Sequence, residues 1–275
     1  NHLLGLRANS GPVFLTSQGQ HAIDTIVEEE MNKRPMFHFV ADDGVTHTGW
    51  RVIREEELCT ACESIELAYV ADGHHRSASA ARAAATLAEN NPNHTGEEEY
   101  NWFLTVLFPA NQLHILPYNR IVFDLQGSTV DEFLENLQEV GNVTPTSNPI
   151  PSTSGTCCVY VGKESGWHEL VFHSIDVDDP IASLDVDLVQ QRVLAPLLGI
   201  GDPRSDTRVD FIGGIRGTDE LERRVDNGDA AIAFSMYATT IEQLLGVADA
   251  GLIMPPKSTW FEPKLRSGLF VHELD

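Results

Sequence analysis

The residues best suited to chemistry lie together in one short segment, Asp72-Gly73-His74-His75-Arg76. The apolar run Leu67-Ala68-Tyr69-Val70 precedes it and predicts the end of a buried strand, and Asp-Gly is typical of a turn. An alanine-rich segment with very high helix propensity, residues 77–87, follows. The spacing therefore places two imidazoles and a guanidinium at the start of a helix, where unpaired N–H groups and the helix dipole favour an anion such as phosphate.

Each residue of this segment has a predicted role. We predict that Gly73 and Arg76 bind the phosphates of a cofactor, and that Asp72, His74 and His75 are catalytic. The carboxylate of Asp72 can orient a histidine, accept a proton or hold a metal ion. The alternative is a simple turn, because Asp-Gly is common in turns and basic residues near helix starts are often just solvated. Spacing alone leaves the two interpretations about equally supported.

A second polar segment, Pro255-Pro256-Lys257-Ser258-Thr259, lies near the C-terminus. The two prolines stiffen its entry, and Lys257, Ser258 and Thr259 offer one cation and two hydroxyls in a row. That composition can bind a phosphate or a carboxylate, and it also suits a surface turn.

Both segments resemble the bacterial and archaeal family called domain of unknown function 1015. Its hallmark is an Ala-Asp-Gly-His-His-Arg segment, which matches residues 71–76, and its C-terminal signature is similar to residues 254–269. The start of the chain, residues 7–15, is a weaker match, so the resemblance spans nearly the whole chain. It favours a cofactor-binding role for Lys257, Ser258 and Thr259. Members of the family usually begin with a further N-terminal portion, and we expect that portion, with any site residues it carries, to be missing here.

The Asp-Gly-His-His-Arg segment also resembles the motif of the ParB-like superfamily, which includes free-serine kinases. In those proteins a similar Gly-X-X-Arg turn at a helix start handles nucleotide phosphates, and nearby acidic residues serve phosphoryl transfer. The resemblance implies a nucleotide (ATP, ADP or CTP) and Mg²⁺ as cofactors, with the metal held by carboxylates and phosphates.

Composition narrows the classes of partner. The chain has 41 acidic and 18 basic residues, a net charge of −23, so it repels phosphate backbones and nonspecific nucleic-acid binding is not expected. No apolar run approaches the length of about 18 residues that a membrane span needs. The four cysteines form no secreted disulfide framework, which favours a cytoplasmic location. We interpret Cys59 and Cys62, despite their C-x-x-C spacing, and the adjacent Cys157 and Cys158 as structural.

The hydrophobic pattern predicts an α+β protein with a mixed sheet flanked by helices and a smaller α+β module in the middle of the chain. We expect three portions: residues 1–120 with the Asp-Gly-His-His-Arg segment, residues 121–180 as the small module, and residues 181–275 with the Pro-Pro-Lys-Ser-Thr segment. We also expect a loop over residues 142–155, a capping box at Thr239–Glu242 that opens a helix, and a final strand over residues 268–273.

The leading functional hypothesis is a nucleotide- or phosphate-handling enzyme, specifically a kinase that phosphorylates the hydroxyl of a small molecule such as free serine. One alternative is a non-catalytic nucleotide-binding switch or sensor that uses the same phosphate contacts. Another is a structural or interaction protein in which residues 72–76 are only a rigid turn. The sequence does not define the substrate, the base of the nucleotide or the oligomeric state.

Overall fold

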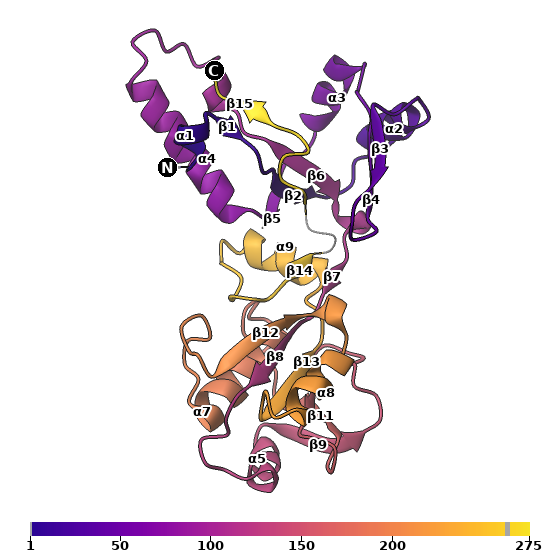
Figure 1. Cartoon of the computed structure of the whole chain (residues 1–275), viewed down its shortest axis with the longest axis vertical. Helices are drawn as coiled ribbons and strands as arrows, with labels where there is room; N and C mark the ends of the chain where they lie inside the picture. Colours follow the sequence, from indigo (N-terminus) through magenta and orange to yellow (C-terminus); the bar gives the residue numbers. More distant parts are fainter. Residues whose placement is uncertain (1, 262–264) are drawn as a thin grey trace. The chain divides into compact units, whose positions relative to one another are not determined.

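The structure is a computed structural model that describes residues 2–261 and 265–275. The chain forms two compact units (Figure 1). Unit 1 comprises Asn1–Leu113 and Pro263–Asp275, and unit 2 comprises His114–Glu262. Both units combine helices with sheets, so the predicted α+β class is confirmed.

Unit 1 contains a three-stranded sheet in the order β5-β2-β6, formed by Tyr69–Asp72, Val13–Ser17 and Thr105–Pro109. Strand β2 is antiparallel to β5 and parallel to β6, so this sheet is mixed, as predicted. The other elements of this part of the unit are the hairpin β3 (Phe37–Val40) and β4 (Thr46–Gly49) and the helices α2 (His21–Met31), α3 (Glu55–Cys62) and α4 (His74–Glu89).

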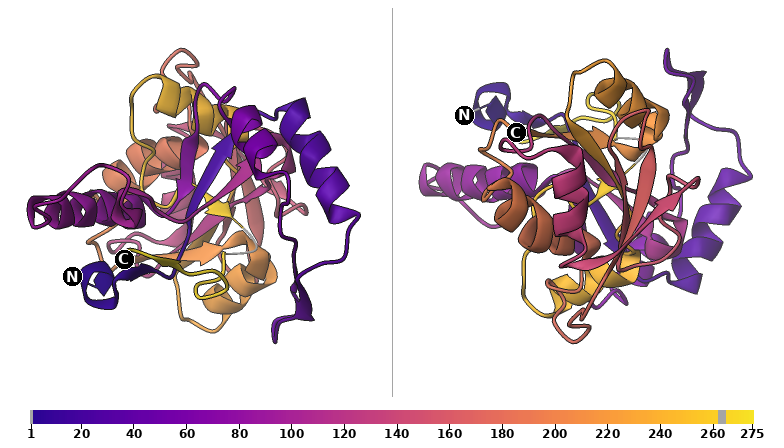
Figure 2. Two further views of the ribbon diagram at one scale, coloured as in Figure 1. Left: turned by 90° about the horizontal axis from the view of Figure 1, so that it is seen from above. Right: turned by 90° about the horizontal axis from the view of Figure 1, so that it is seen from below.

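The two ends of the described chain lie side by side in unit 1. Strand β1 (Ala8–Asn9) follows α1 (His2–Leu6) and pairs antiparallel with β15 (His272–Glu273) (Figure 2). The pairing continues outward through the backbone, because Leu274 N–H donates to Arg7 C=O and Gly268 N–H donates to Ser10 C=O. Helix α1 also contacts α4. The C-terminal segment therefore fixes the segment that carries Asn9, Ser10 and Gly11.

Unit 2 is built on a six-stranded antiparallel sheet in the order β12-β8-β13-β10-β11-β9. Its strands are Val209–Gly213 (β12), Tyr118–Val122 (β8), Ile232–Met236 (β13), Thr156–Tyr160 (β10), Trp167–Phe172 (β11) and Gly141–Thr146 (β9). A separate two-stranded pair joins β7 (Ile115–Leu116) to β14 (Trp260–Phe261). The helices are α5 (Val130–Leu137), α6 (Asp185–Val189), α7 (Ala195–Leu198), α8 (Asp219–Asp226) and α9 (Ile241–Asp249).

Apolar side chains cover both faces of the six-stranded sheet. One face carries the larger core, into which α5 inserts Phe133 and Leu137, and the other face is closed by Leu221 of α8. Because successive side chains of a strand alternate between faces, the adjacent Cys157 and Cys158 of β10 belong to opposite cores. Both are fully buried free thiols, which confirms that they are core residues.

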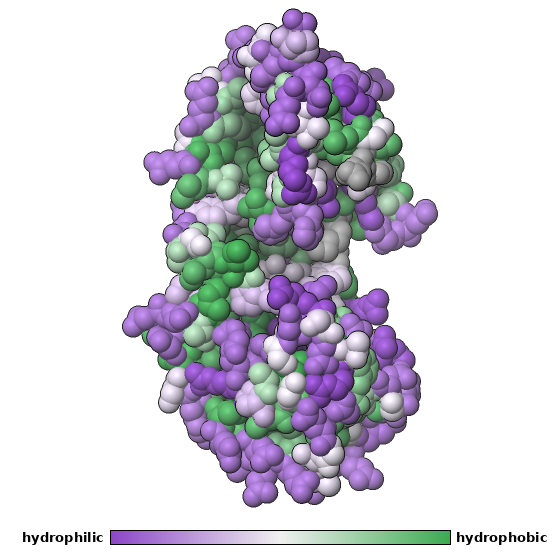
Figure 3. Space-filling view, turned by 90° about the vertical axis from the view of Figure 1, so that its left-hand side faces the viewer, coloured by the Kyte–Doolittle hydropathy of each residue, from purple (hydrophilic) through white to green (hydrophobic). Residues whose placement is uncertain are grey.

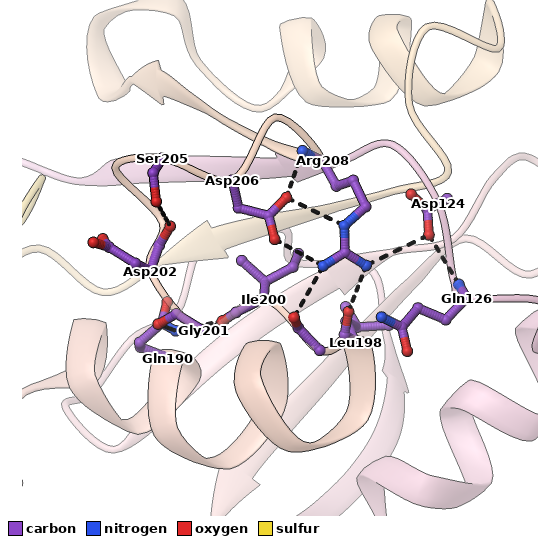
Figure 4. A network of polar contacts seen from close by, with 11 residues as sticks. Asp124, Gln126, Gln190, Leu198, Ile200, Gly201, Asp202, Ser205, Asp206 and Arg208 are labelled. Carbon is purple, nitrogen blue, oxygen red and sulfur yellow. Dashed lines mark hydrogen bonds and ion pairs between the residues drawn. The ribbon is translucent and has the colours of Figure 1, made fainter.

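Arg208 illustrates how an arginine of this acidic chain is neutralised within the fold. Its guanidinium donates to the carbonyls of Leu198 and Gly199 at the end of α7 and forms an ion pair with Asp206 at 2.7 Å (Figure 4). A second carboxylate, Asp124, lies 3.9 Å away. The arginine thus satisfies the terminal carbonyls of a helix while acids compensate its charge.

Three local predictions were wrong. Residues 141–146 form strand β9 rather than a loop, because they pair with β11 at the edge of the sheet, with Pro145 tolerated there. The capping box of α9 uses Thr240 and Gln243, one position later than predicted, since Thr239 is buried and its hydroxyl donates to Ser258 C=O. The predicted final strand over residues 268–273 shortens to His272–Glu273.

The three portions predicted at residues 1–120, 121–180 and 181–275 stay a prediction. The six-stranded sheet takes β9, β10 and β11 from the second portion and β12 and β13 from the third.

Hydrophilic residues cover most of the face drawn in Figure 3, in line with the charge of the chain. Among the helices that the structure describes, none has the length and apolarity needed to cross a membrane.

Candidate functional site

The strand-turn-helix segment of unit 1 has the predicted order, and its helix starts earlier than expected. Strand β5 ends at Asp72, Gly73 is the N-cap, and α4 begins at His74 rather than at Ser77. His74, His75 and Arg76 therefore form the first turn of a 16-residue helix instead of a loop before it. All three side chains therefore lie at the positive end of the helix dipole, as the sequence predicts.

Gly73 is required by its backbone conformation and by its neighbour. Its φ is +96°, in the left-handed region that favours glycine. A β-carbon at this position would lie 2.9 Å from Arg76 Nη2 and 3.1 Å from Arg76 Nε. The guanidinium of Arg76 thus lies directly against the turn, over the start of α4.

Arg76 is held in place by packing rather than by an acid. A β-carbon at Gly11 would lie 3.4 Å from Arg76 Cδ and 3.2 Å from Ser267 Oγ, so the Arg76 side chain passes between two glycines. Within residues 2–261 and 265–275, the guanidinium makes no hydrogen bond or ion pair, and its residue is exposed. The chain has 41 acidic residues, yet no described acid forms an ion pair with Arg76. The N–H groups of its guanidinium are therefore available to a ligand.

The backbone donors of the turn are only partly used. Arg76 N–H and Ser77 N–H both donate to Gly73 C=O, at 2.8 and 3.0 Å. Gly73 N–H donates to Asp72 Oδ1 at 2.8 Å. The N–H groups of His74 and His75 find no acceptor among the described residues. Two adjacent N–H groups and a guanidinium therefore meet at one helix start, the arrangement that binds phosphate groups in proteins.

A cavity of about 500 Å³ opens beside this helix start within unit 1. Its polar wall includes His75, Arg76 and Arg82 of α4 together with Asn9, and its apolar wall includes Leu3, Leu4 and Ala83. Asn9 is 8% exposed, and its Nδ2 is buried without a hydrogen-bond partner among the described residues. The volume lies within the range of about 300–1,000 Å³ that small-molecule sites occupy.

Only one of the two histidines lines the cavity. His75 and Arg76 line it, whereas Asp72, Gly73 and His74 are not part of its lining. Sequence reasoning did not identify Asn9 or Arg82 as site residues. Helical periodicity could have found Arg82, because residues 75, 79, 82 and 86 share one face of a helix that begins at residue 74. For Asn9 the local signal is only the weak family match of residues 7–15, and its place beside α4 depends on the pairing of β1 with β15.

The second predicted segment lies in unit 2. Ser258 is buried, and its hydroxyl donates to Pro255 C=O at 2.5 Å within the turn. Lys257 is exposed with φ +58°, and Thr259 is half-buried. The roles of Lys257, Ser258 and Thr259 in cofactor binding stay a prediction, as do the catalytic roles of Asp72, His74 and His75.

We expect Gly73→Ala to weaken phosphate binding by about tenfold or more, because the new methyl group displaces Arg76 and charge-assisted hydrogen bonds contribute about 1.5–3 kcal/mol. Gly96→Ala is the matched control. Gly96 has φ +98° and nothing within 4 Å of its β-carbon position. Both variants should lose about 1–2 kcal/mol of unfolding free energy from the left-handed backbone. Calorimetric titration with phosphate and denaturant unfolding measure the two effects, and equal phosphate affinities in the two variants would contradict this role of Gly73.

No curated protein matches the chain. Among solved structures, a conserved hypothetical protein from Pyrococcus furiosus is 10% identical with a TM-score of 0.42, the match covering 97% of this chain and 82% of the other. A free serine kinase in complex with AMP is 12% identical with a TM-score of 0.38, the match covering 92% and 85%. Likenesses at this level do not assign a ligand or a reaction to this chain. The family described as "Protein of unknown function (DUF1015)" matches residues 1–187, and the chain therefore belongs to the DUF1015 family.

Proposed function

We propose that unit 1 binds the phosphate groups of a nucleotide at the N-terminus of α4. The observation that carries this proposal is the Arg76 guanidinium, which lies against the Gly73 turn without a protein partner among the described residues. The neighbouring N–H groups of His74 and His75 supply further donors. The base and ribose occupy the adjacent cavity, whose wall combines Leu3, Leu4 and Ala83 with the polar groups of Asn9 and Arg82.

We further propose that the nucleotide donates its terminal phosphoryl group to the hydroxyl of a small molecule, of the free-serine type. The bond from phosphorus to the acceptor oxygen forms, the bond from phosphorus to the leaving nucleotide oxygen breaks, and the hydroxyl proton passes to Asp72. Such transfer depends mainly on positioning and on stabilisation of charge, which the cationic turn provides. The resemblance of residues 72–76 to the motif of free-serine kinases supports this reaction class.

The residues present suit a magnesium ion that arrives with the nucleotide. Among the residues that the structure describes, no group of three or more histidine, cysteine or acidic side chains could hold a metal by itself. Mg²⁺ is commonly held by one or two carboxylates together with substrate phosphates, and Asp72 is the carboxylate of the turn that would hold it. The ion supplies charge neutralisation, which also offsets the repulsion between Asp72 and a bound phosphate.

We expect ATP, ADP or CTP with magnesium to raise the melting temperature of the chain, and Arg76→Ala to abolish that shift. A ligand at one hundred times its dissociation constant adds about 2.7 kcal/mol to stability. Arg51→Ala is the matched control, because Arg51 is an exposed arginine of unit 1 outside the cavity lining. Inorganic phosphate alone tests the contribution of the phosphate contacts. An identical shift in Arg76→Ala and in the wild-type chain would contradict the proposed site.

We expect Asp72→Asn to retain nucleotide affinity but to lower phosphoryl transfer by about 10²–10⁴-fold, the usual contribution of a general base. Asparagine keeps an oxygen that accepts Gly73 N–H and removes the proton acceptor. Transfer is measured by ³¹P NMR with the nucleotide, magnesium and free serine. Transfer at the wild-type rate would contradict the role of Asp72. Nucleotide binding without transfer to serine or any other small hydroxyl compound would instead support the alternative function, a non-catalytic switch or sensor.

A further inference from the structure

Unit 2 contains a buried arginine that has no counter-ion among the residues that the structure describes. Arg120 lies in β8 in the interior of the six-stranded sheet, opposite Phe211 of β12 and Phe234 of β13, and is 2% exposed. Its Nη1 donates to Tyr118 C=O at 3.1 Å, while its Nε is buried with no acceptor among the described residues. Burial lowers the pKa of Arg120 to about 10, so the guanidinium keeps its charge at neutral pH. An uncompensated buried charge is costly for a fold.

A second cation reaches the same aromatic group. Lys257 Nζ lies 5.3 Å from the centre of the Tyr118 ring and 5.9 Å from that of Phe211, and Arg120 Cζ lies 5.6 Å from the Phe211 ring. No carboxylate among the described residues forms an ion pair with either cation. Two positively charged groups therefore lie near the Phe211 ring, and no described carboxylate pairs with them, although the acids of the chain outnumber its bases.

The turn that carries Lys257 is firmly anchored. The Ser258 hydroxyl donates to Pro255 C=O, and the Thr239 hydroxyl donates to Ser258 C=O at 3.0 Å. Trp260 packs edge-to-face on Tyr118, and a β-carbon at Gly213 would lie 2.7 Å from its ring. The left-handed backbone of Lys257 is thus imposed by its surroundings. Its ammonium group donates to the Tyr118 hydroxyl at 3.4 Å, which holds the cation beside the aromatic rings.

We propose that Arg120 and Lys257 form an oxyanion-binding site of unit 2, beside the rings of Tyr118 and Phe211. The ligand is the phosphate or carboxylate group of a small molecule, which both cations attract and which compensates the buried charge of Arg120. Entry is from the side of Lys257, which is exposed, past the half-buried Tyr118 and Phe211. The contrast with Arg208 of the same unit supports this assignment, because Arg208 is neutralised by Asp206.

The test uses the full chain with Arg76→Ala, so that the phosphate site proposed in unit 1 is already lost. Calorimetric titrations with inorganic phosphate and with malonate distinguish a phosphate site from a carboxylate site. We expect one of the two anions to bind, and Lys257→Gln to weaken its binding by about tenfold. Lys163→Gln is the matched control, since Lys163 is an exposed lysine of unit 2 that lies 3.7 Å from Asp226 and should not affect anion affinity.

Arg120→Met provides an independent readout. If the arginine is retained for an anion, its replacement by an apolar side chain should abolish anion binding while the melting temperature without ligand stays the same or rises. The absence of binding of either anion to the Arg76→Ala chain would overturn the proposal. Equal affinities in the Lys257→Gln and Lys163→Gln chains would also overturn it, and neither result would bear on the nucleotide site of unit 1.

Discussion

The left-handed turn at Gly73 is the constraint on which the candidate site depends. It allows the chain to pass from β5 into α4 without an intervening loop, so the helix begins with the two histidines and Arg76. It also leaves the space in which the Arg76 guanidinium lies. Any other residue at this position would strain the backbone and displace the cation. This glycine therefore positions the backbone N–H groups of the helix start and leaves room for the arginine, while the pairing of β1 with β15 positions the opposite wall of the cavity.

The described arginines differ in whether an acid neutralises them. Arg54, Arg208 and Arg223 each form an ion pair with at least one carboxylate, as expected where acids are abundant. Arg76 has no acid partner among the described residues despite lying on the surface, and Arg120 has none despite being buried. Other exposed arginines, such as Arg34 and Arg51, also form no ion pair with described residues, so Arg76 is distinguished by its position against the Gly73 turn and Arg120 by its burial.

Much of the fold can be predicted from local sequence. The remaining parts form only through pairing between segments that are distant in the sequence. The amphipathic pattern of α5 and the apolar strands β10 and β13 are visible in the sequence because local periodicity reports burial. Strand β9 is not visible in the sequence, because Asn142, Pro145 and their neighbours have a composition typical of a loop. They form a strand only by pairing with β11. The sequence predicts the start of α4 three residues too late, since alanine has a higher helix propensity than the histidines and the arginine that precede the alanine-rich segment.

The site shows the same division between local and long-range information. Asp72 to Arg76 form a contiguous turn that its own sequence predicts, whereas Asn9 and Gly11 reach Arg76 only because the C-terminal segment pairs with β1. Arg120 and Lys257 are distant in sequence and meet at Phe211 through the order of strands in unit 2. Local spacing could therefore indicate an anion site at one helix start, but not the cavity beside it or the second cationic pair.

The most direct measurement is a two-dimensional ¹H–¹⁵N NMR titration of the labelled chain with ADP and magnesium. If α4 binds the phosphates, the backbone amide resonances of His74 and His75 should move first and furthest, since these N–H groups have no acceptor in the described part of the unliganded chain. The amide of Ile241 at the start of α9 should stay in place. Resonances of His74 and His75 that remain unchanged while the nucleotide saturates the protein would contradict the account.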